Sequence, residues 1–322
     1  MFDFWMENRD MMRQLETVQN IMDTRLEIDD PEIREAIKHF AENGGKMVRP
    51  ALFLLFSQLG NAGQSGDPRI AASLELLHLA TLIHDDIIDD ADTRRKQPTV
   101  QAQLGKDTAV YAGDFIYTVY FELLVETMAG TPFLARNAAS MKKILNGELT
   151  QKALMYQTDC TREQYMQAIA GKTAELLSLA CEEGAYFGGL DEENVLRARQ
   201  IGEHIGLAFQ IYDDVLNFSL DFVNEKPILT DVTQGIYTLP LLIARDKEPA
   251  VISKYLESPQ ALTKPELIEL AEFVKSCGAL DEAISEATHL TNLALSDIAH
   301  LPDTTSRKIL TEVTNKLLKR QF

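Results

Sequence analysis

The chain has 322 residues, 45% of them apolar, which is enough to bury one large core or two smaller ones. Aspartate and glutamate number 49 against 31 lysines and arginines, so the formal net charge is -18. This balance argues against nucleic acid as the main partner, because phosphate backbones are bound by basic faces, but it allows a small phosphorylated ligand in a local basic pocket.

Helical periodicity runs through almost the whole chain, as in the stripe Leu15, Val18 and Met22. Prolines after aspartates predict helix starts at Pro31 and Pro68. In chain order, we expect helices at 6–26, 31–43, 49–60, 67–91, 101–128, 132–157, 162–187, 192–218, 238–246, 248–256, 264–276, 279–299 and 304–320. Alternating β-branched runs, internal repeats and low-complexity linkers are not evident. The sequence therefore predicts one all-α domain over residues 1–322.

The three cysteines are odd in number and far apart, which argues against zinc ligation and against a disulfide framework. We expect reduced thiols in a cytoplasmic protein. The first ten residues lack the basic start of a signal peptide, and no apolar run reaches the length of about 18 residues that a membrane span requires.

The strongest feature is the acidic cluster Asp85, Asp86 and Asp89, which follows an apolar helical segment. On a helix, Asp85 and Asp89 are one turn apart and share a face, with Asp86 at its edge. Carboxylates at this spacing repel each other, and a divalent cation removes the conflict. Mg²⁺ suits such oxygen ligands and completes its shell with waters and substrate phosphates. The neighbouring His84 is expected to support the helix rather than to bind a metal.

A second cluster, Asp213 and Asp214 with Asn217, copies the spacing of the first and again follows an apolar helix. One such cluster alone is more often a solvated acidic helix end. Two clusters with equal spacing favour a paired site, in which Mg²⁺ between two acidic helices holds a diphosphate.

Basic residues group at predicted loop–helix junctions near these aspartates. A single basic residue is more often a surface charge, but in a chain this acidic the grouping indicates diphosphate binding. The residues are Lys46, Arg49, Arg94, Arg95, Lys172 and Lys226.

Together these motifs resemble the trans-isoprenyl diphosphate synthases, over residues 44–240. The family patterns GGKxxRP, DDxxD, RR and PT occur at 44–50, 85–89, 94–95 and 98–99. Further signatures match at Gly113-Asp114, Gly147-Glu148, Lys172-Thr173-Ala174, Ala208-Phe209-Gln210 and Thr238-Leu239-Pro240. The resemblance implies an isoprenoid synthase-like helical bundle around a central cavity. It is nearest to the long-chain type, like the catalytic component of hexaprenyl or heptaprenyl diphosphate synthase.

The resemblance also implies roles for individual residues. Asp85, Asp86, Asp89 and Asp213 would bind Mg²⁺ on an allylic diphosphate, with Asp214 in support, and Arg94, Lys172 and Lys226 would grip that diphosphate. Lys46, Arg49, His78 and Arg95 would bind isopentenyl diphosphate, and Thr173 and Gln210 would face the reacting carbons and the released pyrophosphate.

The implied partners are the two diphosphate substrates, with a membrane touched at most peripherally for product release. The family usually forms dimers, for which the apolar stretch 110–125 is suitable, and some long-chain enzymes pair the catalytic chain with a small helper chain.

Product length follows from the residues upstream of Asp85. Early-stopping family members resemble one another in having a bulky aromatic residue there, whereas this chain has Ala80 and Thr81. We therefore expect about six to seven isoprene units, with Leu77, Ile116 and Tyr120 as the next candidates for the floor of the channel.

Four residues depart from the family pattern around the allylic site: Lys96, Asn217, Glu225 and Ile236. They leave open a catalytically weak subunit that needs a helper chain. A terpene cyclase shares the fold and the DDxxD motif but has no need of Lys46, Arg49 and Arg95. A non-catalytic acidic helical regulator has no need of three crowded aspartates.

Overall fold

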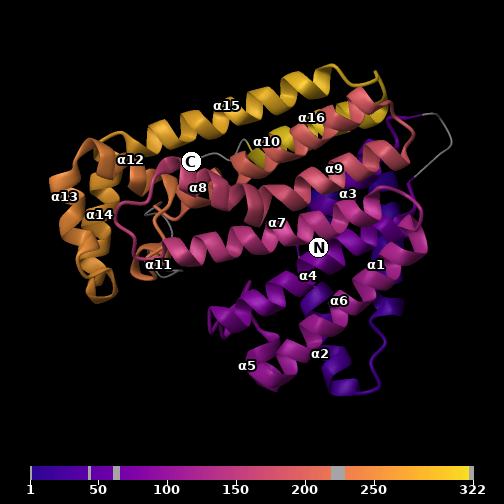
Figure 1. The fold of residues 1–322 in the computed structure, drawn as a ribbon, viewed down its shortest axis with the longest axis horizontal. Helices are drawn as coiled ribbons and strands as arrows, with labels where there is room; N and C mark the ends of the chain where they lie inside the picture. Colours follow the sequence, from indigo (N-terminus) through magenta and orange to yellow (C-terminus); the bar gives the residue numbers. More distant parts are fainter. Residues whose placement is uncertain (1, 43–44, 61–65, 219–228, 319–322) are drawn as a thin grey trace. The chain divides into compact units, whose positions relative to one another are not determined.

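The computed structural model describes residues 2–42, 45–60, 66–218 and 229–318, and this part of the chain is almost entirely helical (Figure 1). The chain divides into two compact units. Unit 1 comprises Met1–Ala138, Ala180–Leu196 and Pro302–Ser306, and unit 2 comprises Ala139–Leu179, Arg197–Leu301 and Arg307–Phe322. The all-α prediction is confirmed.

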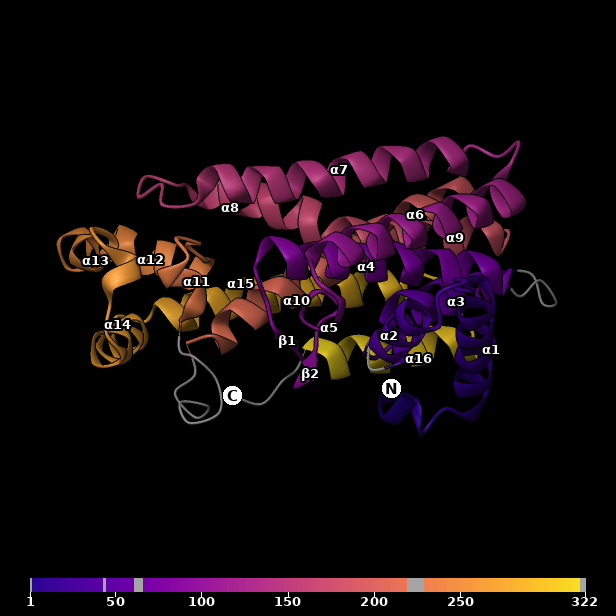
Figure 2. The ribbon, with the colours of Figure 1, turned by 90° about the horizontal axis from the view of Figure 1, so that it is seen from below.

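Unit 1 is organised around two apolar helices, α4 (Pro68–Ile88) and α6 (Lys106–Met128), which pack along each other (Figures 1 and 2). The helix α4 is buried over most of its circumference, as expected of a helix in a core, whereas α6 has a buried face and an exposed face. The helices α1 (Arg9–Arg25) and α3 (Val48–Ser57) pack against α4, and α2 (Pro31–Glu42) packs against α6.

Unit 2 contains α8 (Arg162–Ile169), α11 (Thr230–Thr233), α12 (Leu239–Lys247), α13 (Pro249–Leu256), α14 (Lys264–Ser276) and α15 (Ala279–Ala299). The helix α12 packs against α13, α14 and α15. Four further helices contribute residues to both units: α7 (Phe133–Leu154), α9 (Glu175–Phe187), α10 (Glu192–Leu216) and α16 (Thr305–Leu318). Within the described ranges, no helix is both long and apolar enough to cross a lipid bilayer.

Three of the differences from the predicted elements lie near the motifs. The expected helix 101–128 is interrupted at Gly105, whose φ of +85° separates α5 (Val100–Leu104) from α6. The expected helix 162–187 contains a π-helical turn, η2 (Ala170–Ala174), between α8 and α9. A short hairpin, β1 (Thr93–Arg94) with β2 (Gln97–Pro98), follows α4 (Figure 2). The hairpin was not predicted, because each of its strands has only two residues.

Candidate active site

The first acidic motif lies where α4 ends. Asp85 and Asp86 belong to the last turn, and the N–H of Asp89 donates to the carbonyl of Asp85 at 2.8 Å. Asp86 is 2% exposed, Asp85 is half-buried and Asp89 is exposed. The structure thus turns Asp86 inward rather than placing it at the edge of the acidic face, because Asp86 continues the buried stripe of Leu79 and Ile83 at helical spacing.

Arg94 neutralises the buried Asp86. Its Nε and a terminal guanidinium nitrogen both lie 2.8 Å from Asp86 Oδ1. Burial raises the pKa of the Asp86 carboxyl, and the guanidinium opposes that rise. The second oxygen, Oδ2, is buried and has no hydrogen-bond partner among the residues the structure describes. This orphaned oxygen is available to a ligand that brings positive charge.

The hairpin β1–β2 presents the two consecutive arginines. Thr93 pairs with Pro98 and Arg94 with Gln97, so Arg95 and Lys96 form the turn. Both turn residues are left-handed, with φ of 52° and 65°, as a two-residue type I′ hairpin requires. Lys96, where the family pattern has glycine, therefore adopts the conformation that glycine would adopt without strain.

A basic cluster in unit 1 brings together residues expected to bind isopentenyl diphosphate. Burial lowers the pKa of Arg49, and the neighbouring Arg95 adds to that effect while Glu75 opposes it. Burial and the charges of Arg49, Arg95 and Arg94 hold the pKa of His78 well below its ordinary value, so this imidazole is neutral at pH 7. Such mutual effects place these groups close to one another, and a polyanion would relieve their repulsion.

Glu75 is a member of this cluster that sequence reasoning missed. It is 8% exposed, and burial raises the pKa of its carboxyl against the opposing charges of Arg49 and Arg95. Its Oε2 and the Nε of Arg49 are both buried without a hydrogen-bond partner in the described part of the chain. The available signal was an isolated acidic residue three positions before His78 in an otherwise apolar helix.

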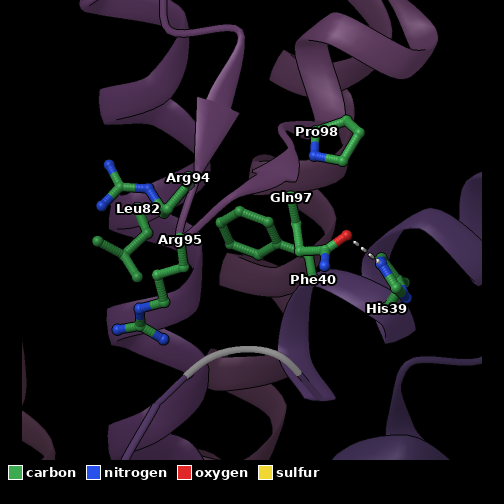
Figure 3. Close-up of a pocket in the computed structure, with 7 residues that line it drawn as sticks. All are labelled: His39, Phe40, Leu82, Arg94, Arg95, Gln97 and Pro98. Atoms are coloured by element: carbon green, nitrogen blue, oxygen red, sulfur yellow. Dashed lines mark hydrogen bonds between the residues drawn. The ribbon is translucent and has the colours of Figure 1, made fainter. Parts of the chain in front are cut away.

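The two arginines of the hairpin also line a pocket in unit 1 (Figure 3). His39 and Phe40 enter it from α2, Leu82 from α4, and Arg94, Arg95, Gln97 and Pro98 from the hairpin. The Gln97 amide oxygen lies 3.4 Å from His39 Nε2 and links the hairpin to α2. Close by, a Cβ built on Gly45 would lie 2.9 Å from the Arg95 guanidinium, so the Gly45 backbone lies directly against this side chain.

The second acidic motif, in unit 2, is held by a chain of hydrogen bonds. Asp214 is 3% exposed and accepts from Tyr165 Oη at 2.6 Å and from Gln210 Nε2 at 2.9 Å. Thr173 Oγ1 in turn donates to Gln210 Oε1 at 2.7 Å. Burial raises the pKa of Asp214 to about 7, although both hydrogen bonds lower it. Tyr165 was not identified from the sequence, because it is 49 residues away from Asp214 in the chain.

Asn217 stands in the last position of the second motif. Its side-chain amide donates to Asp231 Oδ2 at 2.7 Å. Asp213 is half-buried, between the buried Asp214 and the exposed Asn217 in accessibility. Two residues singled out in the sequence lie outside the described residues: Lys226, expected to bind the allylic diphosphate, and Glu225, which departs from the family pattern.

Lys172 lies in the π-helical turn η2. Its Nζ is 3.0 Å from Glu148 Oε2 and 2.8 Å from Gln151 Oε1, both on α7. A Cβ built on Gly147 would lie 2.4 Å from the Lys172 backbone nitrogen, so glycine lets the two backbones approach closely. Single π turns inside helices are frequent at functional sites.

The relative direction of α4 and α6 is fixed by contacts at both ends. A Cβ built on Gly113 would lie 2.3 Å from His84 Nε2, so the His84 ring packs against Gly113. At the other end, Arg69 pairs with Glu126 at 3.5 Å. The two helices are therefore antiparallel.

This register aligns the residues expected to control product length. Ala80 falls level with Ile116, and Leu77 falls level with Tyr120; all four are buried. Thr81 is half-buried, and its hydroxyl donates to the carbonyl of His78 at 2.8 Å. On α4, upstream of the aspartates, Ala80 thus places a small side chain where the sequence predicts an open channel.

The chemistry of the acidic motifs suits a hard divalent cation. In the described ranges, no three His, Cys, Asp or Glu side chains converge closely enough to hold a metal by themselves. Residues 85–89 belong to unit 1 and residues 213–214 to unit 2. The donors are carboxylate oxygens, including the orphaned Asp86 Oδ2, and Mg²⁺ needs few of them because it takes its other ligands from water and substrate phosphate.

Comparisons with known proteins match most of the chain. The family model "Polyprenyl synthetase" matches residues 30–270. The all-trans-nonaprenyl-diphosphate synthase (geranyl-diphosphate specific) of Rhodobacter capsulatus is 35% identical, covering 88% of this chain and 87% of its own length. Heptaprenyl diphosphate synthase component 2 of Geobacillus stearothermophilus is 30% identical and covers 96% of both chains.

Solved structures of similar proteins have the same fold. The geranylgeranyl pyrophosphate synthase of Lactobacillus brevis superposes with a TM-score of 0.93 at 36% identity and covers 99% of each chain. The polyprenyl synthase of Caulobacter crescentus, complexed with calcium and isoprenyl diphosphate, superposes with a TM-score of 0.89 at 28% identity, covering 98% of this chain and 97% of its own. The names of the first three of these proteins give three different lengths of the prenyl chain.

Proposed function

Because the chain belongs to the polyprenyl synthetase family, as its motifs predicted, we propose that it is a magnesium-dependent trans-prenyltransferase. An allylic diphosphate condenses with successive isopentenyl diphosphates, and each cycle releases one pyrophosphate. The basic cluster of Arg49, His78 and Arg95 carries this proposal. Grouping the partly buried cations Arg49 and Arg95 is unfavourable in the free protein, and a bound diphosphate supplies negative charge.

Isopentenyl diphosphate binds in unit 1. Arg49 and Arg95 offer planar forks of N–H donors that match phosphate oxygens, and Lys46 adds a mobile point charge. His78, neutral at pH 7, donates one N–H without adding to the repulsion between the arginines.

The allylic diphosphate binds at the acidic motifs. Asp85, Asp86, Asp89 and Asp213 would hold Mg²⁺, with Asp214 in support, and a bound metal would supply positive charge to the leaving diphosphate. Arg94 and Lys172 bind the same diphosphate together with Lys226. Their carboxylate partners in the structure, Asp86 and Glu148, keep both cations in place before substrate arrives.

In each cycle the allylic C–O bond breaks and leaves an allylic cation and pyrophosphate. The isopentenyl double bond attacks the cation to form the new C–C bond, and the resulting cation loses a proton to the released pyrophosphate. The Thr173 hydroxyl donates its hydrogen bond to Gln210, so its oxygen lone pairs are left to stabilise the developing positive charge.

The product has about six to seven isoprene units. Between Pro68 and Asp85, α4 extends about 25 Å at ~1.5 Å per residue, roughly the length of five isoprene units of ~5 Å each, which supports a product longer than four units. Ala80 presents only a methyl group to this path, one and a half turns before Asp85.

The working assembly is a single domain of residues 1–322 that pairs with a second copy or a small helper chain. Tyr111, Phe121 and Val125 on α6 are exposed at 75%, 45% and 58%, which supports an apolar interface. The relative named as component 2 supports a helper chain. The unpaired thiols of Cys160, Cys181 and Cys277 support a cytoplasmic location, with product delivered to a membrane only peripherally.

Purified protein incubated with farnesyl diphosphate, isopentenyl diphosphate and Mg²⁺ tests this function. Pyrophosphate release should require both substrates and should stop when a chelator removes the metal. Release from the allylic substrate alone would identify a terpene cyclase. Absence of release, restored by no candidate helper chain, would favour a non-catalytic regulator. Chromatography of the dephosphorylated product should show a main species longer than four units.

A further inference from the structure

The N-terminal segment contacts a residue of the isopentenyl diphosphate site. The short helix η1 (Phe2–Trp5) precedes α1, and Trp5 is 2% exposed. The Trp5 indole Nε1 donates to the backbone carbonyl of Lys46 at 2.5 Å, and Lys46 Nζ lies 5.3 Å from the centre of the Phe4 ring. Consecutive aromatic residues thus hold the backbone and the ammonium group of one lysine.

This contact falls on a strained turn. Gly45 has a φ of +138°, and Met47, the residue before α3, is left-handed at φ 51°. A non-glycine residue in this conformation costs about 1 kcal/mol or more, so the turn needs outside contacts to keep its shape. Trp5 supplies one such contact, and the Arg95 guanidinium against Gly45 supplies another.

The support of η1 is itself rigid. The N–H of Asn8 donates to the carbonyl of Trp5 at 2.8 Å, and the Asn8 side chain caps α1 by accepting from Met11 N. The helix α1 packs against α3 and α4, the helices that carry Arg49 and His78. The aromatic pair therefore joins Lys46 to the same framework as the other residues of the site, all within unit 1.

We propose that Phe4 and Trp5 are positioning residues for isopentenyl diphosphate. Trp5 fixes the backbone of Lys46, and the Phe4 ring restrains the exposed ammonium group that binds the substrate diphosphate. This inference rests on the proposed function, because it uses Lys46 as a diphosphate ligand. A flexible lysine loses less conformational entropy on binding when a ring face already restrains it, so affinity for isopentenyl diphosphate rises.

Trp5 is the only tryptophan of the chain, so its fluorescence reports directly on this contact. Wild-type protein is titrated with isopentenyl diphosphate, and separately with inorganic pyrophosphate, without metal or allylic substrate. We expect a saturable change in Trp5 emission that Lys46→Ala abolishes at the same ligand concentrations. The inference would be overturned if Lys46→Ala showed the same emission change as wild type, or if wild type showed no emission change at all.

Steady-state kinetics with two variants complete the test. Phe4→Leu keeps apolar bulk without a ring face, and Trp5→Phe keeps a ring without the donor. We expect the KM for isopentenyl diphosphate to rise about two- to fivefold in Phe4→Leu and about tenfold in Trp5→Phe, with kcat and the allylic KM within twofold of wild type. Met6→Ala, next in the chain and 62% exposed, is the matched control and should equal wild type.

The outcomes separate the inference from the proposed function. Active variants with an unchanged KM for isopentenyl diphosphate overturn the positioning role alone. Equal losses for both substrates and in kcat show a purely structural role and also overturn it. A wild type that never couples the two substrates refutes the proposed function, whereas the fluorescence titration with pyrophosphate still tests whether Phe4 and Trp5 hold an anion-binding lysine.

Discussion

Glu183 offers a sharp test of the interior of unit 1. It is fully buried on α9, and Asn137 Nδ2 donates a short hydrogen bond to its Oε1. Tyr120 Oη donates to the Asn137 amide oxygen at 2.9 Å, while Glu183 Oε2 has no partner within the described residues. Burial raises the pKa of the Glu183 carboxyl to about 8, so the folded protein carries it protonated at neutral pH.

The sign of the pH dependence follows from this raised pKa. Between about pH 4.5, where the unfolded chain ionises, and about pH 8, the folded state holds a proton that the unfolded state has lost. Stability is therefore fully present below pH 4.5 and falls as pH rises to about 8. A rise from 4.5 to about 8 is about 3.5 pKa units and corresponds to a loss on the order of 5 kcal/mol across this window.

Glu183→Gln replaces the titrating carboxyl by an amide that does not titrate, and it keeps the shape of the side chain and the oxygen that accepts from Asn137. We expect Glu183→Gln to match wild type at pH 5 within about 1 kcal/mol and to exceed it by about 3–4 kcal/mol at pH 9, measured by urea unfolding followed by circular dichroism. The control Glu182→Gln breaks the 2.8 Å pair with Arg136 and should be destabilising at both pH values. A constant difference between Glu183→Gln and wild type from pH 5 to 9 would refute the assignment of a protonated Glu183.

Three further changes test the site and its frame. Tyr165→Phe removes one of the two donors that hold the Asp214 carboxylate, which in turn orients the Gln210 amide, and should lower kcat about tenfold in the coupling assay; an unchanged kcat would contradict this. Ala80→Phe should shorten the main product on chromatography, and an unaltered product would show that the chain does not pass this residue. Lys96→Gly should raise the free energy of unfolding by about 1 kcal/mol by relieving the left-handed turn, and a loss of stability in urea would argue against strain there.

Helix ends were predictable where local chemistry decides them. The helices at 264–276 and 279–299 have the predicted bounds. Thr263 and Glu266 form a capping box at the first, and Gly278, at φ 74°, separates it from the second. The break at Gly105 was not predicted, because apolar residues continue on both sides of it and a single glycine does not by itself end a helical pattern.

The identities of the candidate site residues were accessible from the sequence, but their partners were not. Motif spacing identified Asp86, Asp214 and Lys172, each on a helix as expected. Tyr165 and Glu75 were missed, since neither belongs to a recognisable pattern. A hydrogen bond such as that from Tyr165 to Asp214 depends on how α8 packs against α10, which sequence periodicity does not specify.

The two acidic motifs bury the same position, which their spacing alone does not predict. In each, the second aspartate is buried, Asp86 at 2% and Asp214 at 3% exposure, while the flanking positions are more accessible. Arg94 holds Asp86, and the neutral donors Tyr165 and Gln210 hold Asp214. Both buried aspartates are therefore held by protein donors, and in Asp86 one oxygen, Oδ2, has no such donor within the described residues.

Asn217 occupies an outward position, where an aspartate would add one negative charge. Its amide instead donates to Asp231 Oδ2 at 2.7 Å, which brings a carboxylate from α11 to the same end of α10. An aspartate at 217 would repel Asp231 at this distance, whereas the amide orients it. The charge absent from the motif is thus supplied by a residue 14 positions later in the chain.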